Sequence, residues 1–174
     1  EIAAATGGIE AVVVFDGPVP AELPEAVAYA DLVAAGQGFD WPELDEHMPA
    51  GLCFTSGTVG KPKGVLYSHR QLVLHALTMA AFDPYGLPAG DRVLAVVPLF
   101  HAMGWNLPYI TALNGSSLVL PGRRLAPEHL VPLIRSEAVT FSSGVPTVWA
   151  DVRRHVDRIG GDLGSLRAIG CGGN

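Results

Sequence analysis

The sequence predicts an α/β fold in which a parallel or mixed β-sheet is flanked by helices. Short apolar runs rich in valine, leucine and isoleucine alternate along the chain with longer segments of helical periodicity. Prolines and glycines mark most of the boundaries between these segments. Of the 174 residues, 49% are hydrophobic and 16% are charged. This composition is typical of a globular chain with a buried core.

The first part of the chain is the least regular. The run Ala11–Phe15 is rich in valine, which predicts a short strand, and the Asp16–Pro18 turn follows it. Residues 19–50 are rich in proline, glycine and acidic side chains, with one possible short helix near residues 26–35. We therefore expect residues 1–50 to be a connecting region with one short strand, and residues 51–174 to form the main domain.

The main domain begins with two extended segments, residues 51–56 and 65–68, on either side of a glycine-rich loop. Ser68 and Gln71 have the spacing of a capping box, which predicts a helix that starts there and ends before Asp83. Further short apolar runs predict buried strands at residues 92–97, 116–120, 139–145 and 166–173.

Helices are expected between these strands. One is predicted near residues 105–113, and a second begins at Pro127 but contains Pro132, which must bend it or shift its start. A third runs from Pro146 to the stop at Gly160. Strands that alternate with helices indicate crossover connections and a largely parallel sheet.

Composition and charge exclude several classes of protein. The formal net charge of −6 leaves no basic stripe for a nucleic acid. Cys53 and Cys171 are far apart and are expected to be small buried hydrophobic side chains in a reducing compartment. The uncharged stretch between Arg92 and Arg123 is interrupted by prolines and glycines too often for a membrane span, so we expect it to be buried core. The N-terminus does not have the pattern of a signal peptide, and Glu1 is expected to be an internal start.

The loop Phe54–Val65, FTSGTVGKPKGV, has the composition of a phosphate-binding loop. Hydroxyl groups come from Thr55, Ser56 and Thr58. Glycines that let backbone amides approach a ligand stand at Gly57, Gly60 and Gly64. Positive charge comes from Lys61 and Lys63. Its spacing does not match the Walker A loop, GxxxxGK[ST], and Pro62 disfavours the helix that should open there. A P-loop NTPase is therefore disfavoured.

The order of these residues, [ST]-[ST]-G-T-x-G-x-P-K-G, resembles the phosphate-binding signature of the adenylate-forming (AMP-binding) superfamily. Val59 departs from the pattern, since the family usually has a second threonine there. The segments VVPLFHAMGWNLPYI, GVPTVW and GCGG are similar to later family motifs, and the first is most like medium- and long-chain fatty acyl-CoA ligases. The resemblance covers the chain after about residue 38, and residues 1–36 carry little of it.

The resemblance implies a partial AMP-binding domain over residues 51–174, part of the large N-terminal domain of an acyl-CoA synthetase. The family's Tyr-Gly-x-Thr-Glu segment, ribose-binding Asp, hinge and C-terminal Lys do not occur in this sequence. We therefore expect a fragment that is inactive alone. The implied reaction is attack of a carboxylate on the α-phosphate of ATP, followed by acyl transfer to coenzyme A, with Mg²⁺ as cofactor.

The resemblance also implies roles for individual residues. The phosphates would be held by Thr55, Ser56, Gly57, Thr58 and Gly60, with Lys63 stabilising the departing pyrophosphate, Thr55 holding Mg²⁺, and Lys61 adding only auxiliary charge. His101 would lie near the carboxylate and the α-phosphate. Trp105 would gate the acyl tunnel, and it would share a helical face with His101 if the helix has begun there. The pocket walls would include Gly144 and Val145 beside the acyl group and Gly172 and Gly173 beside the nucleotide.

Two alternatives remain open. One is a ligase for aryl or short-chain acids instead of fatty acids, and the other is a noncatalytic nucleotide-binding or interaction module. The expected partner is a small carboxylic acid, a fatty acid in the favoured interpretation, and neither a nucleic acid nor a transmembrane segment is expected. The expected location is the cytoplasm, with peripheral membrane association left open. The sequence does not fix the oligomeric state.

Overall fold

The structure is a computed structural model, which describes residues 8–55, 61–81 and 86–173. The chain divides into two compact units, Glu1–Glu43 and Leu44–Asn174. In the first unit, strand β1 (Val13–Val14) pairs in parallel with β2 (Val27–Ala28), and helix α2 (Tyr29–Ala35) follows directly. The predicted strand and helix are both present, but each is shorter than its apolar run, and β2 was not predicted.

The second unit begins with a β-hairpin and a helix. Strand β3 (Pro49–Thr55) pairs antiparallel with β4 (Lys63–Ser68), and helix α3 (His69–Ala81) continues from it. The predicted capping box is confirmed, because Gln71 Oε1 accepts a hydrogen bond from the Ser68 amide at 2.8 Å and Ser68 Oγ accepts one from the Gln71 amide at 3.3 Å. These two hydrogen bonds therefore fix the point where β4 ends and α3 begins.

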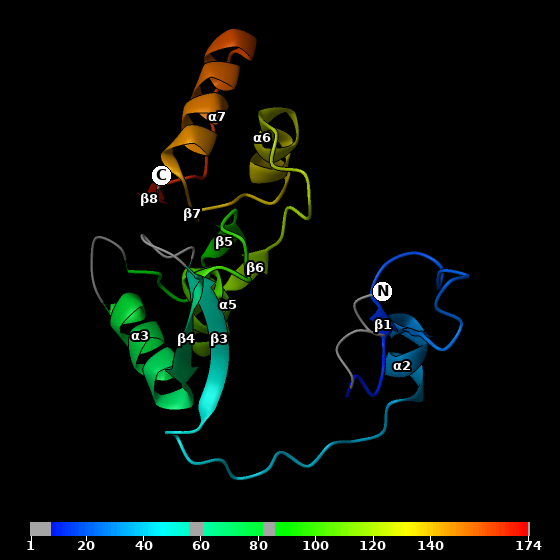
Figure 1. Cartoon of the computed structure of the whole chain (residues 1–174). Coiled ribbons are helices and arrows are strands. Elements are labelled where there is room, and N and C mark those ends of the chain that lie inside the picture. The colour runs from blue at the N-terminus through cyan, green and yellow to red at the C-terminus, as the bar shows by residue number, and fades with distance from the viewer. Residues whose placement is uncertain (1–7, 56–60, 82–85, 174) are drawn as a thin grey trace. The chain divides into compact units, whose positions relative to one another are not determined.

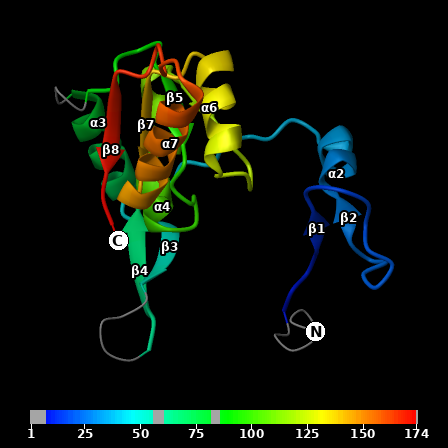
Figure 2. The ribbon, with the colours of Figure 1, turned by 90° about the horizontal axis from the view of Figure 1, so that it is seen from above.

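The remaining strands form one parallel sheet of four strands, in the order β6-β5-β7-β8 (Figures 1 and 2). The strands are β5 (Arg92–Ala95), β6 (Ser117–Val119), β7 (Phe141–Gly144) and β8 (Ala168–Cys171). The crossover helices are α5 (Leu107–Asn114), α6 (Pro127–Ser136) and α7 (Pro146–Ile159). The predicted α/β class is confirmed, and α6 runs through Pro132 without ending.

Each face of this sheet has its own core, as the alternation of side chains along β5 shows. Val93 and Ala95 pack in the cluster with residues of α3 and α5, whereas Leu94 and Val96 pack in the cluster with α6 and α7. Figure 1 shows the same three layers, with α6 and α7 on one side of the strands and α3 and α5 on the other. In the part of the chain that the structure describes, no helix is long and apolar enough to cross a bilayer.

The strand order reverses beside β5. The chain leaves β5 through α5 to its neighbour β6, and then returns through α6 to β7 on the other side of β5. In open parallel sheets, ligands bind outside the carboxyl ends of the strands at such a switch point. The carboxyl ends of β5 and β7 are therefore where the fold itself offers a binding crevice.

The segment after β5 differs from the prediction. A right-handed helix was expected from about residue 105, but the five residues Ala102–Asn106 all have positive φ, from 46° to 63°, and form the left-handed turn that is labelled α4 (Ala102–Trp105). The right-handed helix α5 begins only at Leu107. Four of the five residues are not glycine, and each such residue costs about 1–2 kcal/mol in this conformation. Tertiary contacts must therefore hold the turn.

Candidate active site

The β3–β4 hairpin presents the residues on either side of the predicted phosphate loop. Thr55 and Lys63 lie opposite each other in the hairpin register, and the Thr55 hydroxyl donates to the Lys63 carbonyl oxygen at 3.4 Å. Both side chains are exposed. The other predicted phosphate ligands lie outside the described residues, namely Ser56, Gly57, Thr58 and Gly60. The hairpin geometry thus fixes where the loop begins and ends.

His101 lies just beyond the carboxyl end of β5, at the switch point. Its amide donates to the Pro98 carbonyl oxygen at 3.1 Å, and its side chain is exposed. His101 and Trp105 do not share a helical face, because the helix has not begun there: His101 has extended φ and ψ of −109° and 121°, and the following residues turn left-handed. The Trp105 ring instead packs on Gly172, whereas the His101 side chain is open to solvent.

Close contacts hold the left-handed turn in place from several directions. The Met103 side chain packs on Gly51 of β3, where an added Cβ would lie 2.6 Å from its Cε. The Trp105 ring packs on Gly172, where an added Cβ would lie 3.0 Å from Cη2. These glycines leave no room for a side chain without a shift of the turn. The turn is therefore packed between the hairpin and the end of β8.

The remaining predicted glycines lie at the carboxyl ends of β7 and β8. The Gly172 amide donates to the Gly144 carbonyl oxygen at 3.4 Å, and a Cβ on Gly173 would lie 3.6 Å from Val145 Cγ1, so the two strand ends run side by side. Gly144 is buried, and a Cβ there would lie 3.1 Å from Nε1 of Trp149. Close packing against α7 thus accounts for the absence of a side chain at Gly144.

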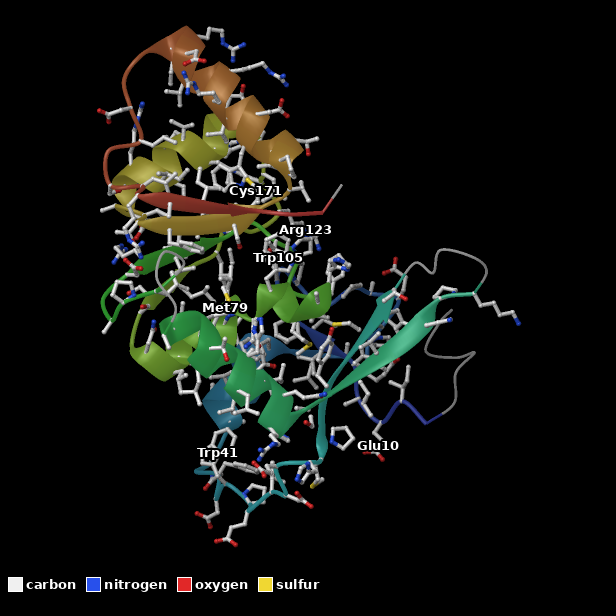
Figure 3. All side chains as sticks on the ribbon, turned by 90° about the vertical axis from the view of Figure 1, so that its left-hand side faces the viewer. Glu10, Trp41, Met79, Trp105, Arg123 and Cys171 are labelled. Carbon is white, nitrogen blue, oxygen red and sulfur yellow. The ribbon has the colours of Figure 1, made fainter. Side chains whose placement is uncertain are left out.

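A pocket of about 510 Å³ lies beside Trp105. Its lining comes from the end of β4, one side of α3 and the left-handed turn, and consists of Tyr67, Gln71, Leu72, His75, Met79, Ala102, Met103, Trp105 and Asn106. In Figure 3, Trp105 and Met79 both lie on the side of the sheet opposite α6 and α7. The pocket is of the size that holds a small organic ligand.

Sequence reasoning missed the α3 side of this pocket. Neither His75 nor Met79 was predicted to belong to a site, yet both line the pocket with Leu72. The spacing of residues 72, 75 and 79 places them on one face of a helix, so periodicity could have grouped them. It could not have shown that a left-handed turn would face them.

A scan against protein-family models matches residues 3–174 to the AMP-binding enzyme family. The match includes residues 1–36 almost completely, so the expectation that they lie largely outside the resemblance is wrong. The chain is 46% identical to a medium-chain-fatty-acid–CoA ligase of Ectopseudomonas oleovorans over 157 residues, which are 88% of this chain and 28% of the relative. It is 48% identical to a 3-methylmercaptopropionyl-CoA ligase of Ruegeria pomeroyi over 146 residues, 83% of this chain and 27% of the relative.

Among solved structures, an o-succinylbenzoate coenzyme A synthetase from Bacillus subtilis, in complex with ATP and a magnesium ion, superposes with a TM-score of 0.70 at 27% identity. That match covers 85% of this chain and 30% of the solved one. The chain thus spans less than a third of the length of these proteins. The family match over nearly all of its residues, together with the parallel sheet that fits the solved enzyme, shows that the chain belongs to the AMP-binding enzyme family.

Proposed function

We propose that this chain is the part of an ATP-dependent acid–thiol ligase that binds the phosphates of ATP and one side of the acyl group. The enzyme joins a carboxylic acid, a fatty acid in the favoured case, to coenzyme A through an acyl-AMP intermediate. The observation that carries this proposal is the pocket beside Trp105, which is lined mainly by apolar side chains and in part by the left-handed turn that follows β5.

The first chemical step joins two anions, so charge neutralisation and alignment dominate it. A carboxylate oxygen attacks the α-phosphorus, the bond from that phosphorus to the bridging oxygen breaks, and pyrophosphate leaves with the electron pair. Lys63 begins β4 at the foot of the loop, with an exposed ammonium group. The positive charge of Lys63 stabilises the departing pyrophosphate. The hydroxyls and amides of Thr55, Ser56, Gly57, Thr58 and Gly60 hold the phosphates.

In the second step, the thiol of coenzyme A gives up its proton to solvent and its sulfur attacks the acyl carbon, the bond from that carbon to the AMP oxygen breaks, and AMP leaves with the electron pair. His101, next to the end of β5, donates a hydrogen bond to the oxygens of the reacting carboxyl and phosphate groups. Trp105 closes the pocket on the acyl side. Val145, Gly172 and Gly173 form the strand ends against which the acyl-AMP lies, with Gly144 behind them.

The Mg²⁺ that the family implies fits the chemistry of Thr55. Mg²⁺ takes hard oxygen ligands, few of them from the protein and the rest from phosphates and water. The Thr55 hydroxyl is such an oxygen. Its hydrogen bond to the Lys63 carbonyl oxygen is long, at 3.4 Å, and therefore weak, so the hydroxyl can exchange this bond for a metal ion. The described residues contain no group of three or more His, Cys, Asp or Glu side chains that could hold a metal. When bound, Mg²⁺ neutralises phosphate charge.

The length of the acyl chain is the least constrained part of the proposal. The apolar lining from Leu72, Met79 and Trp105 suits an alkyl group. The Ruegeria relative is named as a ligase for a short sulfur-containing acid, and its similarity keeps a short-chain substrate as the second candidate. The cytoplasmic location expected from the sequence stays a prediction.

Carboxylate-dependent exchange of pyrophosphate into ATP tests the proposal directly. The assay uses the natural-length protein that contains this chain, with straight acids from two to sixteen carbons and with benzoate. We expect exchange that rises with chain length to an optimum. The variant Lys63→Ala should lose about 100-fold or more of the exchange rate, because a preorganised charge at the departing group is removed.

Lys61→Ala is the matched control, since it removes the same charge two residues away, and its loss should be several times smaller. A protein that binds ATP but exchanges pyrophosphate with no acid would contradict the ligase proposal and favour the nucleotide-binding module. An optimum with benzoate or with acids of two to four carbons would select the second candidate substrate.

A further inference from the structure

We propose that Asn106 is a positioning residue that sets the width of the acyl pocket. It does so by tying the left-handed turn, which carries Trp105, to helix α3. The proposal rests on the function proposed above, because it gives the pocket its role as the acyl site. No residue assigned there performs this task.

The Asn106 side chain joins the two walls of the pocket. Its Nδ2 donates to the carbonyl oxygen of Leu72 at 2.9 Å, and both residues line the pocket. Leu72 belongs to α3, which also contributes His75 and Met79, whereas Asn106 ends the turn that contributes Met103 and Trp105. This hydrogen bond therefore ties the wall that α3 forms to the wall that the turn forms, in addition to the apolar packing of α3 on α5.

Helix capping does not account for this asparagine. Asn106 is the N-cap residue of α5, and its carbonyl oxygen accepts from the Ile110 amide at 3.0 Å. An asparagine at an N-cap ordinarily uses its side-chain oxygen to accept from the first helical amides. Here the side chain makes no such bond, because its amide reaches across to α3. Asparagine also tolerates the left-handed φ of 63° found here, but that tolerance concerns its backbone and does not explain the bond to Leu72.

The orientation of the amide is set by its surroundings. Asn106 is 3% exposed, and rotating the amide by half a turn would place Oδ1 against the Leu72 carbonyl oxygen, two acceptors in contact. In the observed orientation, Oδ1 is buried and has no hydrogen-bond partner among the described residues. An unpaired buried acceptor lowers stability, so this side chain is not optimised for stability alone.

The consequence for the site is geometric. Trp105 immediately precedes Asn106, and its ring rests on Gly172. With the Asn106 amide bonded to α3, the last two residues of the turn are held on two sides, Asn106 by Leu72 and Trp105 by Gly172. Without that bond, α3 and α5 stay packed through Ala76, Leu107 and Ile110, but the turn itself is no longer tied to α3 and can shift locally. The pocket then widens and accepts bulkier acids.

Three substitutions separate the side-chain bond from the backbone conformation. Asn106→Gly keeps the left-handed backbone without strain but removes the bond. Asn106→Ala removes the bond and adds strain, and Asn106→Asp keeps the shape but turns the donor into an acceptor. Asn114→Ala is the matched control, because Asn114 Nδ2 donates in the same way to the Leu87 carbonyl oxygen at the far end of α5.

In the natural-length protein, Asn106→Gly and Asn106→Asp should each raise the KM for the best straight acid about threefold to tenfold, the range expected for one hydrogen bond. The KM for ATP should change less than about twofold, and the kcat/KM ratio of a branched to a straight acid should rise about threefold or more. Asn114→Ala should leave the KM for the straight acid and the branched-to-straight kcat/KM ratio unchanged. Kinetics like those of the unaltered protein for Asn106→Gly, with impairment only for Asn106→Ala, would overturn the proposal.

A second measurement does not depend on turnover. Amide hydrogen exchange in peptides covering residues 101–107 should be faster in Asn106→Gly than in the unaltered protein and in Asn114→Ala. If the protein activates no acid, the ligase proposal fails, yet this exchange still decides whether Asn106 holds the turn. Equal exchange in all three proteins would contradict the positioning role.

Discussion

The contact between Trp105 and Gly172 gives the sharpest prediction for a single residue. A methyl group at Gly172 would lie 3.0 Å from Cη2 of the indole ring, closer than carbon atoms normally approach. Gly172 does not have a left-handed φ, so alanine fits its backbone. Gly172→Ala should therefore displace the Trp105 ring and raise the KM for the acid about threefold to tenfold. Steady-state kinetics on the natural-length protein measure this change.

Gly170→Ala is the control for this effect. It adds a methyl group on the same face of β8, but at 3.4 Å from Ser143 Cβ, an ordinary contact, and away from Trp105. Its KM for the acid should stay within about twofold of the unaltered value. In Gly172→Ala, replacing Trp105 by phenylalanine should recover part of the lost affinity, because the smaller ring vacates the space. Additive losses in that double variant would show that the two residues act independently.

For single residues, the sequence could predict a role where a motif names the side chain, but not where the role depends on a contact in the folded chain. His101, Trp105 and Gly172 could be named from a motif, and all three lie at the carboxyl ends of the parallel strands. Asn106 could not be named, because its importance depends on the Leu72 carbonyl oxygen, which lies 34 residues earlier in the chain. A hydrogen bond between distant segments leaves no periodic signal in the sequence.

Among the elements, the predictable ones are those that begin and end with local signals. Helix α7 runs from Pro146 to Ile159, as expected from a proline at its first position and a glycine after its last. The left-handed turn carries no such signal, since Ala102, Met103 and Trp105 all prefer right-handed conformations. Contacts with β3, α3 and β8 impose it, so it becomes visible only once the whole unit is assembled.

Helix α6 supplies a prediction about stability. Ile134 is fully buried in the core between α6, α7 and the sheet. Its replacement by alanine should lower the free energy of unfolding by about 2–5 kcal/mol, because it leaves a cavity where the surrounding side chains cannot collapse completely. Urea titration monitored by far-UV circular dichroism measures this loss.

Leu133 is the neighbouring control, since it is only partly buried against the same cluster. Leu133→Ala removes a comparable side chain and should cost clearly less than Ile134→Ala. Equal losses from the two variants would show that the layer between the sheet and α6 is not the tightly packed core that the structure describes.

At the scale of the whole molecule, the two ends of the parallel strands have different tasks: the carboxyl ends carry the candidate site, and the amino ends carry contacts that stabilise the fold. The candidate site lies at the carboxyl ends of the strands. At the amino ends, buried Asp91 precedes β5, accepts a hydrogen bond from the Thr140 hydroxyl at 2.7 Å and pairs with Arg167. Arg167 also donates to the Gly86 carbonyl oxygen at 3.1 Å. These contacts join the starts of β5, β7 and β8.

Asp91→Asn should therefore affect stability and leave the site unchanged. The substitution keeps the shape but removes the charge that pairs with Arg167. We expect a loss of about 1–3 kcal/mol in the free energy of unfolding, since buried partners lose a charged acceptor while Arg167 remains partly open to water. The KM values for acid and ATP should remain unchanged at temperatures where the variant is folded. A rise in the KM for the acid, without a fall in stability, would show that the two edges of the sheet are not independent.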